Sequence, residues 1–449
     1  MSNIQSEGET SPAESQQGSS LKKKTVSASI WTIASYGTNQ VLRLGSNLLL
    51  TRLLFPEAFG LMALVQIFLI GLEMFSDLGI GPSIIHNKRG DEPAFLNTAW
   101  TVQVIRGFTL WMCSFLLAWP VAQFYEEPKL IQLLPVSGVT AFLAGLQSTK
   151  MATANRNLKV RQLALIELGS YVAGLCLMIL WAWQYKSIWA LVAGNLLTAT
   201  LRMILSHVAL EGEKNYFYWE RGAFQEINRF GRWIFLSSLM YFLASQGDRL
   251  VIGRLLALRF LGIYNVALTM SMIGDQVVRK VGYKVLFPSY AKLVRDSPER
   301  LYRNLRKSRI ILIALNSVIS LFFIFFGKQL INLLYDNRYT GAGWILQVLA
   351  VGMMIRILEN TYSDVLLAKG KSNLMAVITV SNILIRFSAM FLGFYWGETN
   401  GLIIGLTCAD WLVYIVVAAC QIRLSLWQPE VDLPTIALAL VGAAFVYFN

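Results

Sequence analysis

The chain has 449 residues, of which 55% are hydrophobic and only 14% carry a charge, well below the roughly 25% usual in soluble domains. This composition excludes a soluble globular protein and predicts an all-α integral membrane protein. The net charge is +13, but the basic residues lie in short loops between apolar segments, which argues against a nucleic-acid partner. The four cysteines lie within apolar segments and lack metal-ligand spacing, so we expect no metal site, disulfide framework or cofactor.

Apolar segments define the predicted domains. Residues 1–25 lack the apolar core of a secretory signal and are predicted to form a disordered cytoplasmic tail. A six-helix lobe over 26–209, a cytoplasmic linker over 210–228 and a second six-helix lobe over 229–426 follow. A thirteenth apolar piece, 433–449, is marginal in length for a span. Since a span needs about 20 mostly apolar residues, we predict twelve spans at 26–52, 58–85, 95–123, 131–154, 160–183, 187–209, 229–253, 258–286, 308–334, 341–367, 373–396 and 400–424.

The loops on one side of the membrane are far more basic than those on the other. One side carries 22 Lys and Arg residues and the other carries 7. Since basic loops stay in the cytoplasm, we predict a multi-pass protein with a cytoplasmic N-terminus. The linker over 210–228 mixes charges with Phe217, Tyr218, Trp219 and Phe224, as a helix lying in the membrane interface would.

Residues 31–79 recur 202 positions later without a gap. At this offset Trp31 matches Trp233, Arg52 matches Arg254, and Gly60 matches Gly262. The two halves are therefore predicted to be copies of one membrane unit, related by an internal repeat around a central cavity.

Polar residues fall at helical spacing inside these repeated segments. Asn39, Arg43 and Asn47 are four residues apart, so they share one helix face. At the equivalent positions of the second copy stand Tyr241, Ser245 and Arg249, and the pair Glu73 and Asp77 corresponds to Asp275 and Arg279. We expect both copies to turn a polar stripe toward a hydrated cavity.

Several stretches resemble a known family. LLLTRLLFPEAFGLMAL (48–64) and FSDLGIGPSII (75–85) resemble the first two helices of lipid-linked oligosaccharide flippases, in the polysaccharide transporter branch of the multidrug/oligosaccharidyl-lipid/polysaccharide exporter superfamily. GDRLVIGRLLALRFLGIYNVAL (247–268) resembles the start of that family's second lobe, and NTYSDVLLAKGKSN (360–373) resembles its helix 10–11 junction. The resemblance covers about residues 26–426.

The resemblance implies a mechanism and a location. In this family two six-helix lobes enclose a cationic cavity and move an undecaprenyl-pyrophosphate-linked sugar repeat unit across the bacterial cytoplasmic (inner) membrane by alternating access. Relatives commonly end after twelve or fourteen helices. The thirteenth apolar piece is therefore a departure from the family pattern.

Charged residues inside the spans need compensation, because each costs at least ~2.5–3.5 kcal/mol on insertion scales. A diphosphate ligand would compensate the arginines, since a guanidinium binds phosphate oxygens bidentately. The candidate substrate-binding residues are Arg43, Arg249, Arg279, Asn39, Asn47, Lys280, Lys284, Arg52 and Arg254. The candidates for positioning these arginines or binding a coupling ion are Glu73, Asp77, Asp248 and Asp275. Interhelical ion pairing without a transport role is the alternative for each of them.

Taken with the resemblance, these patterns favour a flippase for surface polysaccharide (O-antigen, exopolysaccharide or capsule) biosynthesis, which is a transporter and not an enzyme. Its expected partners are the lipid-linked oligosaccharide and membrane lipids, with a polysaccharide polymerase and export machinery as further candidates. A drug or organic-cation antiporter of the same superfamily is one alternative, although its site should be rich in acids and aromatics. A membrane glycosyltransferase or polymerase is another, although such enzymes normally need larger outward loops than this chain has.

Overall fold

The computed structural model describes residues 31, 34–35, 37–231, 234–281, 290 and 298–448. Within these residues every regular element is a helix, as the composition predicted. The predicted tail over 1–25 lies outside the described residues. Eight of the described helices are long and apolar enough to cross a membrane, or nine if one bent pair counts as a single span. The prediction of twelve or thirteen spans therefore stays a prediction.

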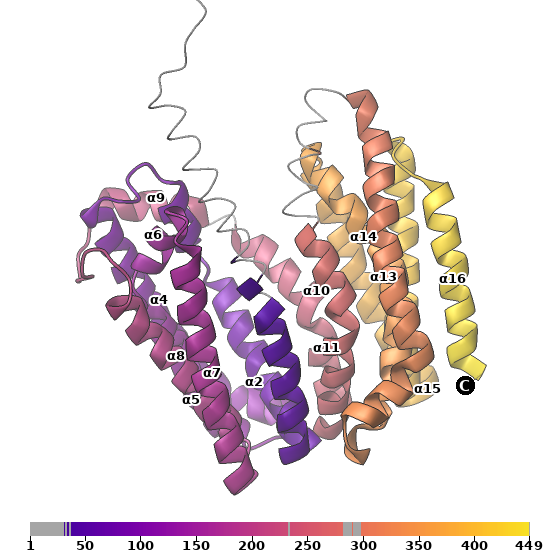
Figure 1. Cartoon of the computed structure of the whole chain (residues 1–449), viewed down its shortest axis with the longest axis horizontal. Helices are drawn as coiled ribbons and strands as arrows, with labels where there is room; N and C mark the ends of the chain where they lie inside the picture. The colour runs from indigo at the N-terminus through magenta and orange to yellow at the C-terminus, as the bar shows by residue number, and fades with distance from the viewer. Residues whose placement is uncertain are drawn as a thin grey trace, which may run out of the picture. The chain divides into compact units, whose positions relative to one another are not determined.

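The chain divides into two compact units. The first unit falls within residues 1–50, 76–120 and 131–235, and the second within 51–75, 121–130 and 236–449. The first unit contains helical residues 37–50 and most of the following helices (Figure 1): α3 (Ile80–His86), α4 (Pro93–Tyr125), α5 (Leu130–Gly145), α6 (Lys150–Arg156), α7 (Val160–Tyr185), α8 (Trp189–Val208) and α9 (Arg221–Gly231).

Two predicted spans of the first half are interrupted. The segment 58–85 divides into α2 (Pro56–Phe75) and α3, because Gly79 adopts a left-handed conformation with φ 62°. The segment 131–154 divides into α5 and α6, which meet at an angle of 56°. Near that break the Ser148 amide donates to the Ser206 hydroxyl at 2.9 Å, so a side chain replaces the helical backbone acceptor.

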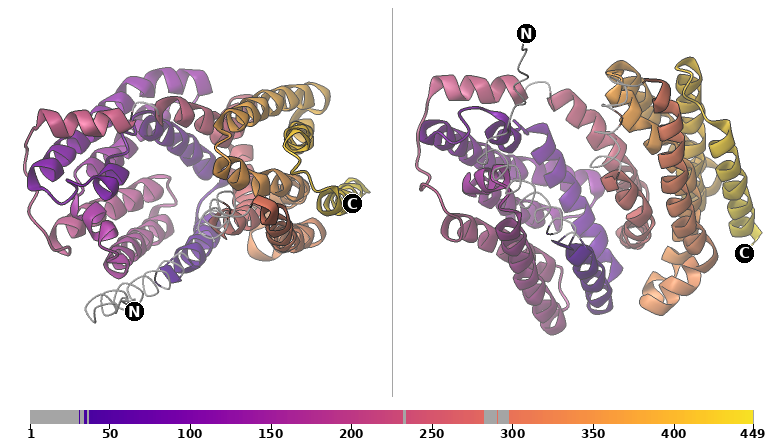
Figure 2. Two further views of the ribbon diagram at one scale, coloured as in Figure 1. Left: turned by 90° about the horizontal axis from the view of Figure 1, so that it is seen from above. Right: turned by 45° about the horizontal axis from the view of Figure 1, so that its top comes forward.

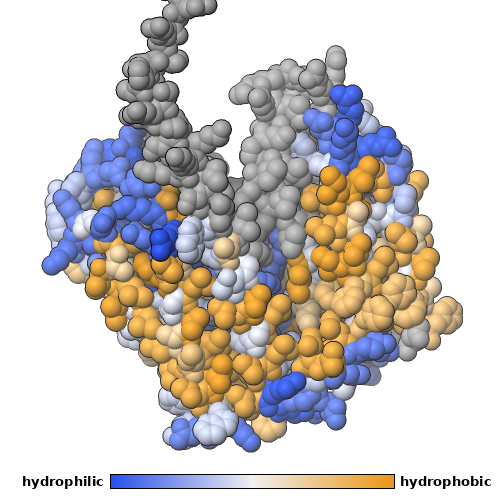
Figure 3. All heavy atoms as spheres, viewed as in Figure 1, coloured by the Kyte–Doolittle hydropathy of each residue, from blue (hydrophilic) through white to orange (hydrophobic). Residues whose placement is uncertain are grey.

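The second unit contains α2, α10 (Ile234–Leu255), α11 (Leu258–Val281), α13 (Pro298–Leu334), the 3-10 turn η2 (Asn337–Tyr339), α14 (Gly341–Ala368), α15 (Ser372–Arg423) and α16 (Pro429–Phe448). α14 packs against α13, α15 and α16, and Figure 2 shows these helices side by side in both views. Hydrophobic side chains cover the visible surface of this bundle between hydrophilic ends (Figure 3), as lipid contact requires.

α2 and α11 cross at two glycines that match at the repeat offset. A Cβ added to Gly60 would lie 2.0 Å from the Leu258 carbonyl oxygen, and one added to Gly262 would lie 2.0 Å from the Pro56 carbonyl oxygen. No side chain fits at either position, so glycine is required for this close approach. The contact is reciprocal, because Pro56 matches Leu258 at the same offset.

The predicted spans 373–396 and 400–424 form the two halves of α15. The helix is broken at Gly397 and at Glu398, where φ is 48°. Gly393 packs against the Gly401 carbonyl and Gly405 against the Ala389 carbonyl, so the halves run antiparallel. The last apolar piece forms α16, which begins four residues before the predicted 433 and packs on α13 and α14.

Candidate functional site

The predicted stripe of the first copy lies on helical residues 37–53. Arg43 is exposed, and Asn39 and Asn47 are half-buried. The same helix is held within the first unit by Ser46, whose hydroxyl lies 3.2 Å from that of Tyr171 on α7. Arg43 has no ion-pair partner in the described part of the chain. Its guanidinium is thus available to an anion.

The acids that follow this stripe are both exposed. Glu73 lies in the last turn of α2. Asp77 accepts a hydrogen bond of 2.8 Å from the Gly79 amide, and Gly79 is where α3 begins. The Asp77 carboxylate therefore stabilises the break that separates α2 from α3.

Arg249 on α10 is half-buried and incompletely hydrogen-bonded. Its Nη1 donates to the Gln246 Oε1 at 2.8 Å. Its Nε is buried and has no partner among the described residues. A buried donor without an acceptor costs about 1–3 kcal/mol, so this guanidinium retains an unused site for a water or an anionic ligand.

The predicted acids of the second copy are buried and hydrogen-bonded. Asp248 accepts from the fully buried Tyr264 hydroxyl on α11, and also from the Arg249 amide at 2.9 Å. Asp275 on α11 accepts from the Asn360 side chain on α14. These contacts connect α10, α11 and α14 within the second unit.

Two arginines share one carboxylate near these acids. Arg356 on α14 binds Asp410 with bonds of 2.9 Å and 3.0 Å to the two carboxylate oxygens, and Arg386 binds Asp410 at 2.6 Å. The Asp410 side chain is only 5% exposed. This cluster ties the two halves of α15 to α14, so it stabilises the bundle.

The repeat-related arginines Arg52 and Arg254, at the predicted outward helix ends, lie in local contacts. Arg52 is exposed and donates weakly to the Leu334 carbonyl at 3.5 Å. Arg254 is exposed, pairs with Glu126 at 3.1 Å and lies over the Phe124 ring. Arg338 donates to the Thr51 and Arg52 carbonyls at 2.9 Å and 3.1 Å, so it caps the end of the first helix.

The side chains of three predicted basic residues lie outside the described residues. Arg279 and Lys280 lie in α11, but their side chains are outside the described residues, as is Lys284 altogether. Their proposed contact with a pyrophosphate stays a prediction.

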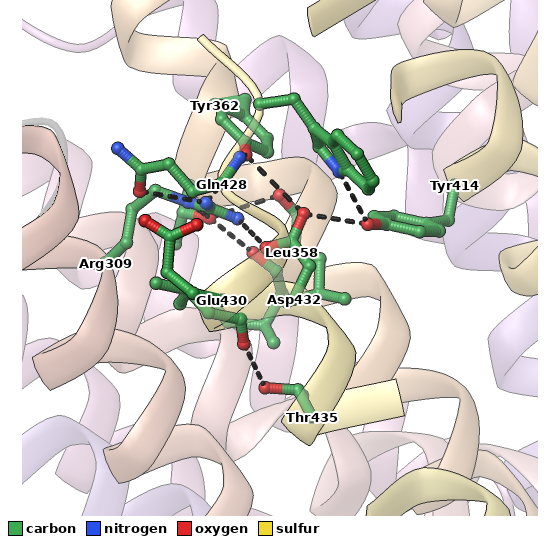
Figure 4. Close-up of polar contacts among 12 residues, drawn as sticks. Arg309, Leu358, Tyr362, Tyr414, Gln428, Glu430, Asp432 and Thr435 are labelled. Atoms are coloured by element: carbon green, nitrogen blue, oxygen red, sulfur yellow. Dashed lines mark hydrogen bonds and ion pairs between the residues drawn. The ribbon is translucent and has the colours of Figure 1, made fainter. Parts of the chain in front are cut away.

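The most buried charged pair was missed by the sequence reasoning. Arg309 on α13 and Asp432 on α16 are joined at 2.6 Å, and both side chains are 0% exposed (Figure 4). Tyr414 also donates to Asp432, at 2.7 Å, and the Arg309 guanidinium lies 3.7 Å from the Tyr362 ring centroid. The predicted span 308–334 contains Arg309, whereas Asp432 lies one residue before the predicted apolar piece 433–449. Nothing in the sequence indicated that these two residues form a pair.

These contacts separate the charges into two kinds. Most buried charges of the second unit neutralise one another, whereas Arg43 and Arg249 keep donors for a ligand. Within the described residues no cluster of three or more His, Cys, Asp or Glu side chains could hold a metal ion.

Known proteins resemble the chain over most of its length. A protein of Klebsiella pneumoniae described as an uncharacterized membrane protein in the cps region is 24% identical over 86% of this chain and 80% of that protein. The lipopolysaccharide biosynthesis protein WzxC of Escherichia coli (strain K12) is 23% identical over 94% of this chain and 88% of its own. Among solved structures, the lipid II flippase MurJ in an inward closed conformation gives a TM-score of 0.70 with 13% identity, covering 93% of this chain and 91% of that one.

A multidrug resistance transporter of the MATE family, in the MOP superfamily, is also similar in fold. Its inward-facing structure gives a TM-score of 0.67 with 15% identity, over 86% of this chain and 94% of that chain. A family model described as polysaccharide biosynthesis protein matches residues 49–344, which is well over half of the chain. The chain therefore belongs to the polysaccharide biosynthesis protein family, on a fold shared with MOP-superfamily transporters.

Proposed function

We propose that this protein is a flippase that moves an undecaprenyl-pyrophosphate-linked oligosaccharide repeat unit from the inner to the outer leaflet of the cytoplasmic membrane. The product would supply surface polysaccharide biosynthesis. Support comes from the family match, from the similarity to a lipopolysaccharide biosynthesis protein and from the fold shared with a lipid II flippase.

The observation that carries the proposal is that two arginines within apolar helices have no acidic partner among the described residues. Arg43 is exposed without an acidic partner in the described part of the chain, and Arg249 keeps a buried Nε without an acceptor. A pyrophosphate would supply the missing acceptors, and its geometry matches the guanidinium fork. Asn39 and Asn47 offer amide donors on the same helix face as Arg43.

Transport by alternating access of two six-helix lobes is the mechanism we propose. The reciprocal packing of Gly60 and Gly262 at the repeat offset supports a two-fold relation between the copies. The proposed second lobe over 229–426 fits α10, α11, α13, α14 and the two halves of α15. α16 would follow it as a thirteenth span.

The acids have two candidate roles in this mechanism. Asp248 accepts the Arg249 amide and the Tyr264 hydroxyl, which supports a role in positioning α10 and its arginine. Asp275 and Glu73 are candidates for binding a coupling ion. An antiporter of organic cations is disfavoured, because an exposed Arg43 repels a cationic drug.

The test is transfer of a fluorescent undecaprenyl-pyrophosphate oligosaccharide between the leaflets of proteoliposomes. Wild type is compared with Arg43→Ala, Arg43→Lys, Arg249→Ala and, as a matched control, Arg423→Ala at the exposed end of α15. A lost charge-assisted contact of about 1.5–3 kcal/mol predicts about a tenfold to hundredfold slower transfer for the alanine variants. The lysine variant should recover only part of the rate, because it keeps the charge and loses the fork.

Two results would contradict the proposal. Undiminished transfer in both alanine variants would remove the arginines from the site. Absence of transfer by wild type under every imposed ion gradient and membrane potential, with several sugar cargoes supplied, would count against the flippase itself.

A further inference from the structure

The linker between α8 and α9 carries four consecutive exposed aromatic residues. Residues 211–220 are not helical, contrary to the expected interfacial helix, and α9 begins only at Arg221. Tyr216, Phe217, Tyr218 and Trp219, here called the aromatic strap, have exposed fractions between 42% and 68%. Such a run of large exposed side chains marks an interaction surface.

The backbone of the aromatic strap is fixed on α4. The amides of Tyr216, Tyr218 and Glu220 donate to the side chains of Asn97, Thr101 and Thr98 at 3.1 Å, 3.0 Å and 3.0 Å, respectively. All three acceptors are buried. Every second backbone amide from Tyr216 to Glu220 therefore donates a hydrogen bond to a side chain of α4. A non-helical segment needs such acceptors where little water is available.

The part of the linker that follows the aromatic strap is occupied by protein contacts. Glu220 binds Arg89 with bonds of 2.9 Å and 3.0 Å. Ala223 and Ile227, on the apolar face of α9, are fully buried against residues of α3 and α4. That face is therefore already covered. Phe217 and Trp219 each contact one protein ring, Trp100 at 5.0 Å and Phe224 at 4.7 Å between ring centroids. They nevertheless remain 68% and 50% exposed, so most of their apolar surface is left for another partner.

The position of the aromatic strap along α4 identifies this partner as lipid. The exposed apolar side chains of α4 extend from Ile105 and Phe108 to Leu116 and Trp119. Eighteen residues separate Thr101, where the strap is bound, from Trp119, which is about 27 Å along a helix. This length is close to the ~30 Å hydrocarbon core of a bilayer, so the strap and Trp119 lie at its two boundaries.

We propose that the aromatic strap is a membrane anchor, inserted at the boundary between headgroups and acyl chains in the cytoplasmic leaflet. Tyrosine and tryptophan prefer this zone because their rings are amphipathic. The leaflet follows from the predicted orientation of the basic loops. Insertion does not depend on anionic lipid, because the strap itself is uncharged and the charges nearest to it cancel: Glu213 and Lys214 precede it, and Glu220 and Arg221 follow it.

The test uses spin labels on single cysteines in the full chain, in proteoliposomes. Cys113, Cys176, Cys408 and Cys420 are first replaced, since all four lie in apolar helices. Labels at positions 217 and 219 are compared with a label at 213 in the same linker and one at 105 on the apolar face of α4. The measured quantity is the ratio of collision with oxygen to collision with a water-soluble nickel complex.

Insertion predicts a ratio at 217 and 219 several-fold above that at 213 and below that at 105, equal in zwitterionic and anionic vesicles. A ratio at 217 and 219 equal to that at 213 would overturn the anchor and leave the strap as a surface for a soluble protein. A high ratio found only in anionic vesicles would replace aromatic insertion by electrostatic adsorption.

Proteolysis gives a second measurement without labels. Phe217→Ser and Trp219→Ser preserve every backbone hydrogen bond of the linker to α4 but also remove ring contacts with Trp100 and Phe224. Phe224→Leu, which removes one of these ring contacts and leaves the strap intact, is the control and should be cut at the wild-type rate. In inverted vesicles we expect trypsin to cut these variants near Lys214 and Arg221 several-fold faster than wild type. Equal cleavage rates would contradict a protective insertion into lipid.

Discussion

Arg43 of the first compact unit and three arginines of the second unit have opposite surroundings inside apolar helices. On helical residues 37–50 of the first unit, Arg43 is exposed and lacks an acidic partner among the described residues. In the second unit, Arg309 is fully buried against Asp432, and Arg356 and Arg386 share Asp410. The difference teaches that an arginine in a membrane helix marks a ligand site only where the protein itself does not neutralise it.

The largest effect should come from breaking the fully buried pair. Arg309→Met leaves Asp432 buried without its cation, which costs about 3–5 kcal/mol. We expect a markedly lower midpoint of thermal unfolding in detergent, with α16 detached from α13 and α14. The midpoint can be followed by tryptophan fluorescence.

The double variant Arg309→Met/Asp432→Leu is the control for this prediction. Replacing both charges by apolar groups of similar size is often neutral or stabilising, so the double variant should regain most of the lost stability. A single variant as stable as wild type would mean that the pair contributes little and that the comparison between the units fails.

A smaller effect is expected at the shared carboxylate. Asp410→Asn keeps the shape and one acceptor but leaves Arg356 and Arg386 without a counter-charge, at a cost of about 1–3 kcal/mol. The same unfolding measurement applies. Transport should fall only as far as the folded fraction falls. Loss of transport at full stability would instead assign Asp410 to the transport cycle.

The sequence predicted the all-α fold, because long apolar runs can be recognised locally. It also gave the offset at which Gly60 and Gly262 later proved to pack reciprocally. The buried pairs could not be predicted in this way. Arg309 and Asp432 are 123 residues apart, and their meeting depends on the rotation of two helices. The aromatic strap was expected to be helical, but the side chains of α4 bind its backbone in an extended form.

A half-buried ion pair in the second unit tests whether burial decides these energies. Arg338 holds the pKa of Asp336 below its ordinary value, chiefly through a side-chain hydrogen bond. Because the folded-state pKa is lowered, the pair stabilises the fold above the ordinary pKa of aspartate and this contribution is lost as the pH falls through the lowered value. The Asp336 side chain is 33% exposed, so solvent screening limits the effect to under about 1 kcal/mol.

The measurement is the unfolding midpoint of wild type and Asp336→Asn between pH 7 and about pH 3. The two proteins should differ at pH 7 and converge at the acid end. A constant difference across this range would show that the carboxylate charge is not what stabilises the contact.

The smallest change in stability should accompany the largest change in transport. Arg43 has no acidic partner among the described residues, so Arg43→Ala should alter the free energy of unfolding by no more than about 0.5 kcal/mol. Transfer of the lipid-linked oligosaccharide should nevertheless collapse in this variant. Side chains that bind each other stabilise the fold, whereas a side chain kept for a ligand adds nothing until the ligand arrives. Addition of the undecaprenyl-pyrophosphate oligosaccharide should therefore raise the unfolding midpoint of wild type and leave that of Arg43→Ala nearly unchanged. A stability loss as large as that of Asp410→Asn would show that Arg43, too, is a structural residue.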